Sequence, residues 1–387
     1  MEYPIIITIN EESIKSNLKF LKDYVGKDVK ISSVVKANAY GHGIKEYVPI
    51  AEKCGIDHFS VFSYNEAIQV YTIVKKTTSI MIMGWIGDEY ISDAITKGIE
   101  FYIFTIERLK IALKMSEKLG ISAKIHLEVE TGMNRTGLSK KEFNDALKII
   151  NANKQNFQIK GICSHLSGPE SIANHVRVKR QISNFKTFVK IMNKNNIFSE
   201  YTHLANSAAT ISYPSSKFNM VRIGIMQYGF WSSKETFLRY SFDNKDLVNP
   251  LERIISMKSQ VMSIKRVKKG EFVSYSTIYL AQNDVKIAVV PIGYSNGYSR
   301  SFTNRGRILI RGTQCSVIGS VNMNMIIVDV TGIDDVKIGD EAVLIGSQND
   351  LVISVDSFSE ITQQINYEIL SRLSINIPRK IIKSERK

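Results

Sequence analysis

A lysine ends the first apolar, β-branched run of the chain, VKISSVVK at residues 29–36. An amine held at the end of a buried strand is desolvated, which lowers its pKa and makes it nucleophilic. A snorkelling or ion-paired side chain is the commoner state of any single lysine. Lys36 is therefore a candidate nucleophile only because reactive residues also end later runs of the same kind.

Four later strand-like runs also end in polar or cationic residues. These are Glu130 to Arg135 after the fifth run, Ser164-His165 after the sixth, Asn206-Ser207 after the seventh, and Arg222 to Ile225 in the eighth. In a parallel barrel such residues meet at one mouth, and small residues after the last strands suit a phosphate. A phosphorylated ligand together with a Schiff-base lysine points to pyridoxal phosphate (PLP).

The elements that must position these residues alternate regularly. Eight strand-like runs are separated by amphipathic, Lys/Glu-rich helical stretches. The runs cover residues 29–36, 58–63, 79–85, 100–105, 123–130, 157–165, 200–205 and 218–226. A doubly wound sheet gives the same alternation, so the number of strands favours a (β/α)8 barrel.

After about residue 245 the pattern changes to short β-rich segments punctuated by turns such as KKG, QND and TGIDD. The fold class predicted is thus α/β: a (β/α)8 PLP-binding barrel over residues 10–240, followed by a mainly β C-terminal domain over residues 241–387. We expect the N-terminal strand, residues 1–9, to pack with the second domain.

Composition narrows the function classes. The chain has 387 residues, of which 44% are hydrophobic and 23% charged, and a formal net charge of +14. The charge is spread along helix faces without a zinc-finger or RNA-binding motif, so we predict no nucleic-acid partner. No apolar run reaches the roughly 18 residues of a membrane span, and three scattered cysteines favour a reducing, cytoplasmic setting. No His, Cys or Asp cluster has metal-ligand spacing, so we predict no metal.

The segment VVKANAYGHG resembles the PLP-attachment motif of the alanine racemases. Further segments resemble that family in the same order, namely ETGMNRTG, SHLSGPE, HLANSAA, VRIGIMQYG, VSYSTIY, PIGYSNGYSR, VNMNMIIVDVTG and INYEILSRL. The resemblance runs from about residue 5 to residue 380. It implies a PLP barrel, a C-terminal β-domain, and a homodimer whose active sites take residues from both subunits.

The resemblance also implies roles for single residues. Lys36 matches the lysine that binds PLP covalently and acts as one catalytic base. Tyr275 matches the second base, which reaches in from the partner subunit. Residues that match contacts to the cofactor phosphate are Tyr40, Ser207, Gly224, Ile225 and Tyr367.

The remaining matches concern the cofactor ring and the substrate. Arg222 matches the arginine that faces the pyridine nitrogen, and His165 the histidine that hydrogen-bonds Arg222 and Tyr275. Arg135 and the backbone of Met323 match contacts to the substrate carboxylate. An arginine at the pyridine nitrogen keeps that nitrogen unprotonated, which favours proton return over decarboxylation or transamination.

Three positions depart from the family pattern. Asn322 to Met325 replace the Cys-Met-Asp-Gln that is frequent in the family. Glu128 stands where many members carry a carbamylated lysine, and as a fixed anion it is expected to hold Arg135. Ser276 replaces the usual glycine beside the tyrosine base.

The sequence thus predicts a PLP-dependent racemase that interconverts L-alanine and D-alanine and supplies D-alanine for peptidoglycan. Racemisation of serine, of lysine or of a broad range of amino acids is the nearest alternative. The β-domain and Tyr275 argue against a non-catalytic PLP-binding protein. The lysine at the end of the first strand-like run argues against a sugar-phosphate barrel enzyme.

Overall fold

The computed structural model describes residues 3–243 and 248–383 of the chain. By its internal contacts the chain divides into two compact units. The barrel unit comprises residues 13–37 and 47–253. The β unit comprises the residues before 13, residues 38–46 and the residues from 254 onward. The segment that follows Lys36 therefore belongs to the β unit from Asn38 on.

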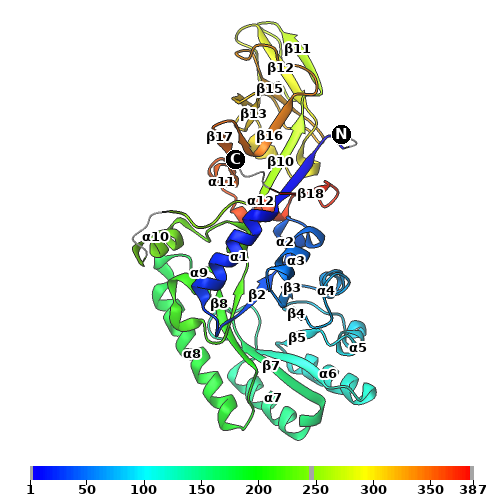
Figure 1. The fold of residues 1–387 in the computed structure, drawn as a ribbon, viewed down its shortest axis with the longest axis vertical. Helices are drawn as coiled ribbons and strands as arrows, with labels where there is room; N and C mark the ends of the chain where they lie inside the picture. The colour runs from blue at the N-terminus through cyan, green and yellow to red at the C-terminus, as the bar shows by residue number, and fades with distance from the viewer. Residues whose placement is uncertain (1–2, 244–247, 384–387) are drawn as a thin grey trace. The chain divides into compact units, whose positions relative to one another are not determined.

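Eight parallel strands form a closed barrel in the barrel unit (Figure 1). The strands are β2 (Lys30–Val34), β3 (His58–Val61), β4 (Ser79–Ile82), β5 (Glu100–Ile103), β6 (Ala123–Glu128), β7 (Phe157–Cys163), β8 (Tyr201–Asn206) and β9 (Met220–Ile223). The first strand pairs with the last, with Ile31 opposite Val221. This closure excludes a doubly wound sheet and confirms the predicted (β/α)8 barrel.

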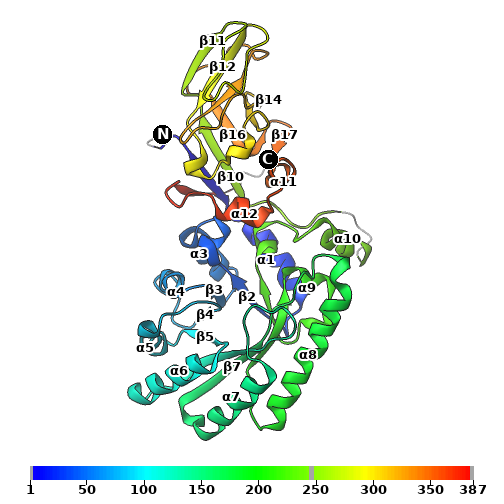
Figure 2. The same cartoon turned by 180° about the vertical axis from the view of Figure 1, so that it is seen from behind.

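Helices cover the outside of the strands, as the opposite views of Figures 1 and 2 show for α4 to α8. The α-helices from the N-terminus to residue 243 are α1 (Glu11–Val25), α2 (Lys36–Tyr40), α3 (Ile44–Lys53), α4 (Tyr64–Tyr71), α5 (Asp88–Thr96), α6 (Ile106–Leu119), α7 (Lys140–Ala152), α8 (His175–Lys194), α9 (Ser207–Ser212) and α10 (Lys234–Asp243). In the described part of the chain, no helix combines the length and the apolar character that crossing a membrane requires.

Helix α7 illustrates why these segments are helical. Ser139 accepts a hydrogen bond from the backbone of Glu142, whose side chain accepts one from the backbone of Ser139 in return. Such a capping box satisfies N–H groups that the first helical turn leaves unpaired. Phe143, Leu147 and Ile150 recur at helical spacing and are buried, so one face of α7 packs on the barrel.

The β unit contains two sheets. The larger has the order β14-β13-β16-β10-β1-β18, with β17 paired to β16, and the smaller has the order β11-β12-β15. The strands are β1 (Ile6–Asn10), β10 (Ile255–Gln260), β11 (Ser263–Val267), β12 (Val285–Val290), β13 (Arg307–Ile310), β14 (Thr313–Ser316), β15 (Ile326–Asp329), β16 (Glu341–Gln348), β17 (Leu351–Ile353) and β18 (Arg379–Ile382). Two helices follow β17, α11 (Val355–Thr362) and α12 (Asn366–Ser371).

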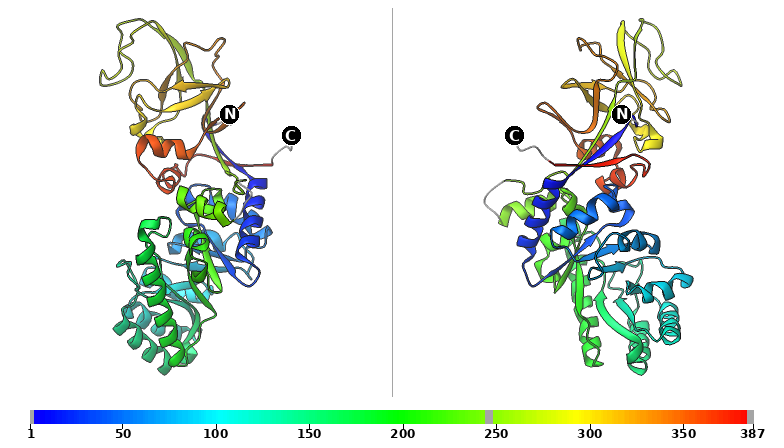
Figure 3. Two further views of the ribbon diagram at one scale, coloured as in Figure 1. Left: turned by 90° about the vertical axis from the view of Figure 1, so that its left-hand side faces the viewer. Right: turned by 45° about the vertical axis from the view of Figure 1, so that its right-hand side comes forward.

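The N-terminal strand β1 is an inner strand of the larger sheet. It pairs antiparallel to β10 and parallel to β18, as the right-hand view of Figure 3 shows in blue and red. Its burial alternates along the strand, with Ile7 and Ile9 fully buried. One face of this sheet therefore carries the hydrophobic core of the β unit.

Gly229 occupies a position in the barrel unit whose backbone suits glycine alone. Its φ of +89° lies in the left-handed region, and an added Cβ would overlap the carbonyl oxygen of Glu252. Asn17 Nδ2 donates a hydrogen bond to that oxygen at 2.8 Å, so the oxygen cannot retreat without losing a partner.

Replacing Gly229 by alanine should lower the free energy of unfolding by about 2–5 kcal/mol, through left-handed strain and overpacking together. Gly120→Ala is the matched control, because Gly120 also has a positive φ of +63° but nothing lies within 4 Å of an added Cβ. That control should cost only about 1–2 kcal/mol. Denaturant unfolding measures both variants, and equal losses would contradict the overlap with Glu252.

Candidate active site

Lys36 lies two residues beyond the end of β2, at the mouth of the barrel. Among the residues that the structure describes, its amine has neither a hydrogen bond nor an ion pair. Burial lowers the pKa of this amine, Arg135 and Arg222 lower it further, and Glu66 opposes them. A lysine amine that is more readily neutral than usual is a competent nucleophile and base.

The backbone that follows Lys36 forms a left-handed helical turn, α2 (Lys36–Tyr40). Ala37, Asn38, Ala39 and Tyr40 have φ values of 52°, 53°, 54° and 53°. This conformation costs each residue with a Cβ roughly 1–2 kcal/mol of free energy. Four such residues in succession indicate that the surrounding structure holds the turn in place.

Contacts on both sides fix this turn. In the barrel unit, Glu66 Oε1 accepts the N–H of Ala37 at 2.6 Å. In the β unit, Gly43 donates its N–H to the carbonyl of Asn38 at 2.9 Å, and Ile44 donates to Asn38 Oδ1 at 3.0 Å. Lys36 is therefore followed directly by a rigid segment.

Arg222, on β9, is a cation with 4% of its surface exposed. Nη1 donates to the carbonyl of His203 at 3.0 Å and lies 2.5 Å from His203 Nδ1. Nη2 donates to the carbonyls of Ser164 at 2.6 Å and Leu204 at 3.1 Å. Within residues 3–243 and 248–383, the Nε–H donor has no partner. The guanidinium is thus firmly held and keeps one donor for a ligand.

In the described chain, no hydrogen bond joins the ring of His165, the expected partner, to Arg222. His203, in β8, occupies that place, because β8 lies beside β9 and its side chain enters the barrel next to Arg222. His165 lies beyond the end of β7. Burial lowers the pKa of His165 to about 3, with Arg222, Arg135 and Lys36 acting in the same direction. The ring of His165 is therefore neutral near pH 7.

The loop that presents Arg135 is organised by one carboxylate. Glu130 accepts the backbone N–H groups of Met133 at 2.7 Å and Asn134 at 2.9 Å, and also that of Gly132. Asn134 lies in the left-handed region with a φ of 58°. The loop is therefore pre-formed, while the side chain of Arg135 remains exposed.

Glu128 is buried below this loop with only part of its carboxylate satisfied. Oε1 accepts a hydrogen bond from Thr136 Oγ1 at 3.1 Å. Oε2 is buried without a hydrogen-bond partner in the described chain. Burial raises the pKa of Glu128, against the effect of Arg135 and Arg222. No direct ion pair joins Glu128 to Arg135 in the described chain, so the expected support of Arg135 is electrostatic over a distance.

Ser207, Gly224 and Ile225 come together after the last two barrel strands. Ser207 begins α9, and its Oγ accepts the N–H of Gly224 at 2.9 Å, which leaves the hydroxyl proton for another acceptor. Ile225 begins the 3₁₀ helix η4 (Ile225–Tyr228), whose first N–H groups have no partner inside the helix. A hydroxyl and backbone donors in this arrangement suit a phosphate.

The remaining predicted phosphate contacts lie in the β unit. The rings of Tyr40 and Tyr367 are 5.8 Å apart at an angle of 54°. Burial raises the pKa of Tyr40, with Tyr367 acting in the same direction. Tyr40 is thus a neutral hydroxyl, which can donate a hydrogen bond to an anion.

Tyr275 and Met323 are neighbours on connected loops of the β unit. Ser320 Oγ donates to the carbonyl of Tyr275 at 3.1 Å, and Ser295 donates its N–H to the carbonyl of Met323 at 3.0 Å. Tyr275 is 72% exposed and Met323 56%. Tyr294, 44% exposed, is a further accessible large side chain of the β unit.

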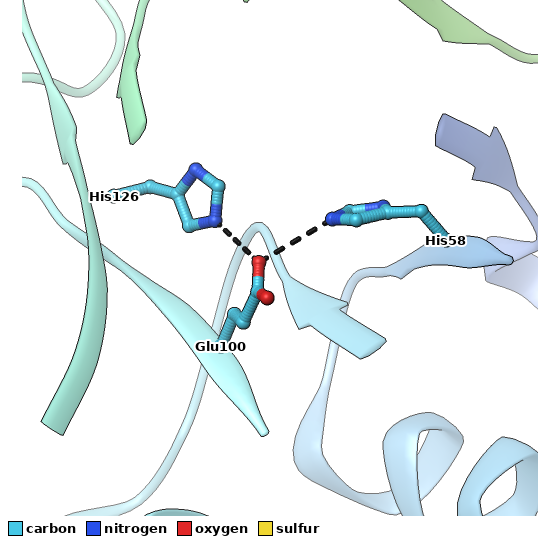
Figure 4. A group of neighbouring side chains, drawn as sticks. All are labelled: His58, Glu100 and His126. Atoms are coloured by element: carbon cyan, nitrogen blue, oxygen red, sulfur yellow. Dashed lines mark hydrogen bonds and ion pairs between the residues drawn. The ribbon is translucent and has the colours of Figure 1, made fainter. Parts of the chain in front are cut away.

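One group of side chains that sequence reasoning missed lies inside the barrel, where His58 and His126 both point at Glu100 (Figure 4). Nε2 of His126 is 2.7 Å from Glu100 Oε2, and Nε2 of His58 is 3.3 Å from the same oxygen. The three residues are far apart in the sequence, so no spacing signal marked them. Glu66 was missed as well, although its place three residues after Ser63 is the signature of a capping box.

A closed parallel barrel with a lysine amine and two arginines at its mouth is typical of enzymes that act on anionic ligands. Family models described as the N-terminal and C-terminal domains of alanine racemase match residues 9–231 and 254–381. The alanine racemase of Methanococcus maripaludis is 32% identical over 380 residues, which are 98% of this chain and 99% of that protein. That of Clostridium perfringens is 33% identical over 378 residues, 97% of this chain and 95% of that protein.

Solved structures agree. The alanine racemase of Bacillus anthracis with bound L-Ala-P is 27% identical, with a TM-score of 0.90 over 99% of this chain and 96% of that chain. The alanine racemase of Bartonella henselae with covalently bound pyridoxal phosphate is 26% identical, with a TM-score of 0.85 over 98% of this chain and 100% of that chain. The chain belongs to the alanine racemase family, as its motifs predicted, and is an enzyme of this type.

The left-handed turn after Lys36 can be tested by substitution to glycine. Ala37→Gly should raise the free energy of unfolding by about 0.5–1 kcal/mol, because glycine adopts positive φ without strain. Ala152→Gly is the matched control at the exposed end of the right-handed helix α7, where the same change should cost about 0.5–1 kcal/mol. Thermal unfolding measures the stability of both variants. A loss of stability in Ala37→Gly would contradict the claim that the left-handed conformation of Ala37 is strained.

Proposed function

We propose that this chain binds PLP through Lys36 and interconverts L-alanine and D-alanine, with Lys36 and Tyr275 as the two bases. The observation that carries the proposal is the lysine amine at the barrel mouth. It has no partner in the described chain, its pKa is lowered, and two arginines act on it. Such an amine reacts readily with an aldehyde, and the cations around it favour an anionic ligand.

The residues around Lys36 fit PLP. Ser207 and Ile225 of the barrel unit would hold its phosphate through a hydroxyl and backbone donors, and the family resemblance adds Tyr40 and Tyr367 as contacts. The Nε–H of Arg222, which has no partner in the described chain, is available to an acceptor, and an unprotonated pyridine nitrogen is one. When bound, PLP withdraws electrons from the α-carbon of an amino acid so that its α-proton becomes acidic.

As a fixed cation, Arg222 would disfavour a proton on the pyridine nitrogen of a bound cofactor and so limit its electron withdrawal. This would favour return of the α-proton over decarboxylation or transamination. Lys36 Nζ and Tyr275 Oη would take and return protons on opposite faces of the substrate. Arg135 and the backbone of Met323 would bind its carboxylate.

The surroundings of Tyr275 support a homodimer with shared sites. The side chains of Tyr275, Phe272, Tyr294 and Met323 are all exposed in the β unit, and exposed apolar side chains of this kind are available to an interaction surface. In the homodimer that the family resemblance implies, Tyr275 would serve the site that contains the Lys36 of its partner. A role in supplying D-alanine for peptidoglycan and a cytoplasmic location stay predictions.

Purified protein supplied with PLP should convert L-alanine to D-alanine, and Lys36→Ala should abolish this activity. Borohydride reduction should leave a phosphopyridoxyl group on the peptide that contains Lys36. Serine, lysine and other amino acids in the same assay define the substrate range, which the changed residues Asn322 to Met325 make the open question. The proposal would be wrong if the cofactor were attached to another lysine or if the protein racemised no amino acid.

The shared site can be tested by complementation. Lys36→Ala and Tyr275→Phe should each be inactive, yet a fully exchanged equal mixture should recover roughly one quarter of wild-type activity. Half of the dimers are then hybrids, and each hybrid has one site with both lesions and one intact site. Mixing two different Lys36 variants is the control, because no hybrid of these has an intact site. Hybrids without activity would place both bases in one subunit.

A further inference from the structure

A group of four titratable side chains on the barrel strands is left unused by the proposed reaction. They are His58, Glu100, His126 and His203, and all have 0% of their surface exposed. They come from β3, β5, β6 and β8. Polar groups are costly to bury unless they are paired, so this set requires a physical account.

A continuous chain of hydrogen bonds joins these residues to Arg222. Arg222 Nη1 lies 2.5 Å from His203 Nδ1, His203 Nε2 lies 2.9 Å from His126 Nδ1, and His126 Nε2 lies 2.7 Å from Glu100 Oε2. An arginine only donates and a carboxylate only accepts. Each histidine between them must therefore accept at Nδ1 and donate from Nε2–H. Only one arrangement of protons satisfies every bond.

The backbone of the barrel strands leaves room for this run of hydrogen-bonded side chains. The pairing of β6 with β7 shifts register between Ile125 and His126, and the pairing of β8 with β9 shifts after His203. Such irregularities re-aim side chains. Gly161 lies opposite His126, and an added Cβ there would overlap His126 Nδ1 and lie 2.8 Å from His203 Nε2. The absence of a side chain at residue 161 makes room for the pair of imidazoles.

The charges agree with this arrangement. Burial lowers the pKa of both His126 and His203, so their rings are neutral. Burial pushes the pKa of Glu100 upward, but hydrogen bonds from His126 and His58 outweigh it and hold the pKa well below its usual value. The run of hydrogen bonds therefore begins at a cation, Arg222, and ends at an anion, Glu100. Lys160 Nζ, 3.9 Å from Glu100 Oε1, adds a weaker ion pair at the far end.

His58 is a side branch of this chain. Its Nε2 points at Glu100 Oε2, and its Nδ1 lies 2.9 Å from Ser32 Oγ. A metal ion held by His58, Glu100 and His126 would have to replace these bonds. The 2.7 Å between His126 Nε2 and Glu100 Oε2 is a hydrogen-bond distance, which leaves no separation for an ion between the two atoms.

We propose that Glu100 is a positioning residue that acts on Arg222 through His126 and His203. Its carboxylate fixes both imidazoles with Nδ1 as acceptor, so that His203 always offers a lone pair to Nη1. The guanidinium is then held in one orientation, with its Nε–H directed away from this network. The functional consequence rests on the proposed role of Arg222 at the pyridine nitrogen, whereas the proton arrangement does not.

The proton arrangement can be read by nitrogen NMR on the full-length, PLP-loaded protein labelled in its six histidines. Protonated and unprotonated ring nitrogens resonate far apart, and single histidine substitutions assign the signals. His126 and His203 should both be neutral with the proton on Nε2. A proton on Nδ1, or a doubly protonated ring, at either residue would overturn the proposal even if no variant folds. One zinc or other metal ion per chain, bound at His58, Glu100 and His126, would overturn it as well.

The effect on the reaction is tested with Glu100→Gln, which removes the charge and nearly preserves the shape. Its amide both donates and accepts, so His126 and His203 should show mixed tautomers. The kcat for alanine should fall by about 10- to 100-fold, as for other partners that orient a functional group, while KM changes by less than about 3-fold.

His58→Gln is the matched control, because it also alters a buried donor to Glu100 but keeps an N–H on that side. It should leave the tautomers of His126 and His203 and the kcat close to wild type. A Glu100→Gln protein with wild-type kcat, or an equal loss in both variants, would overturn the positioning role. If wild-type protein has the predicted tautomers but racemises no amino acid, the proposed function fails and the proton arrangement stands.

Discussion

A guanidinium buried in the interior of a parallel barrel is the constraint on which the site depends. Removing a charge from water costs several kcal/mol unless hydrogen bonds and a counter-charge compensate. Arg222 meets this requirement with three backbone carbonyls and the ring of His203. Because the carbonyls of His203 and Leu204 belong to β8, the strand beside β9, the barrel itself determines where the cation lies. The donor that remains can serve a ligand without any rearrangement.

The same requirement explains the distribution of charge at the barrel mouth. Burial lowers the pKa of Lys36 and of His165, and the nearby cations Arg135 and Arg222 lower both pKa values further. The nearby anion, Glu128, is buried, and burial raises its pKa. Positive charge is therefore in excess at the place where the amine lies. This excess keeps Lys36 reactive and attracts phosphate and carboxylate groups.

Much of the fold follows from local patterns in the sequence. The β-branched runs predicted the barrel strands because those strands are buried on both faces, and Lys36 was found because it directly follows one of them. The left-handed turn was not predicted, since Ala37 and Ala39 are residues that normally favour a right-handed helix. The exchange of His165 for His203 as the partner of Arg222 depends on how β8 and β9 shift in register, which periodicity does not reveal. The contacts of Glu100 to His58 and His126 span 42 and 26 residues, and only closure of the barrel brings them together.

The glycine at residue 161 limits which sequence changes this barrel can accept during evolution. Any larger residue there displaces the imidazoles of His126 and His203, and an apolar residue at either histidine leaves its neighbours with unmatched hydrogen-bonding groups. Single changes at these positions are therefore penalised, whereas a coordinated replacement by a well-packed apolar set is not. Across relatives these positions should covary as a block, with glycine at residue 161 retained wherever both histidines are present.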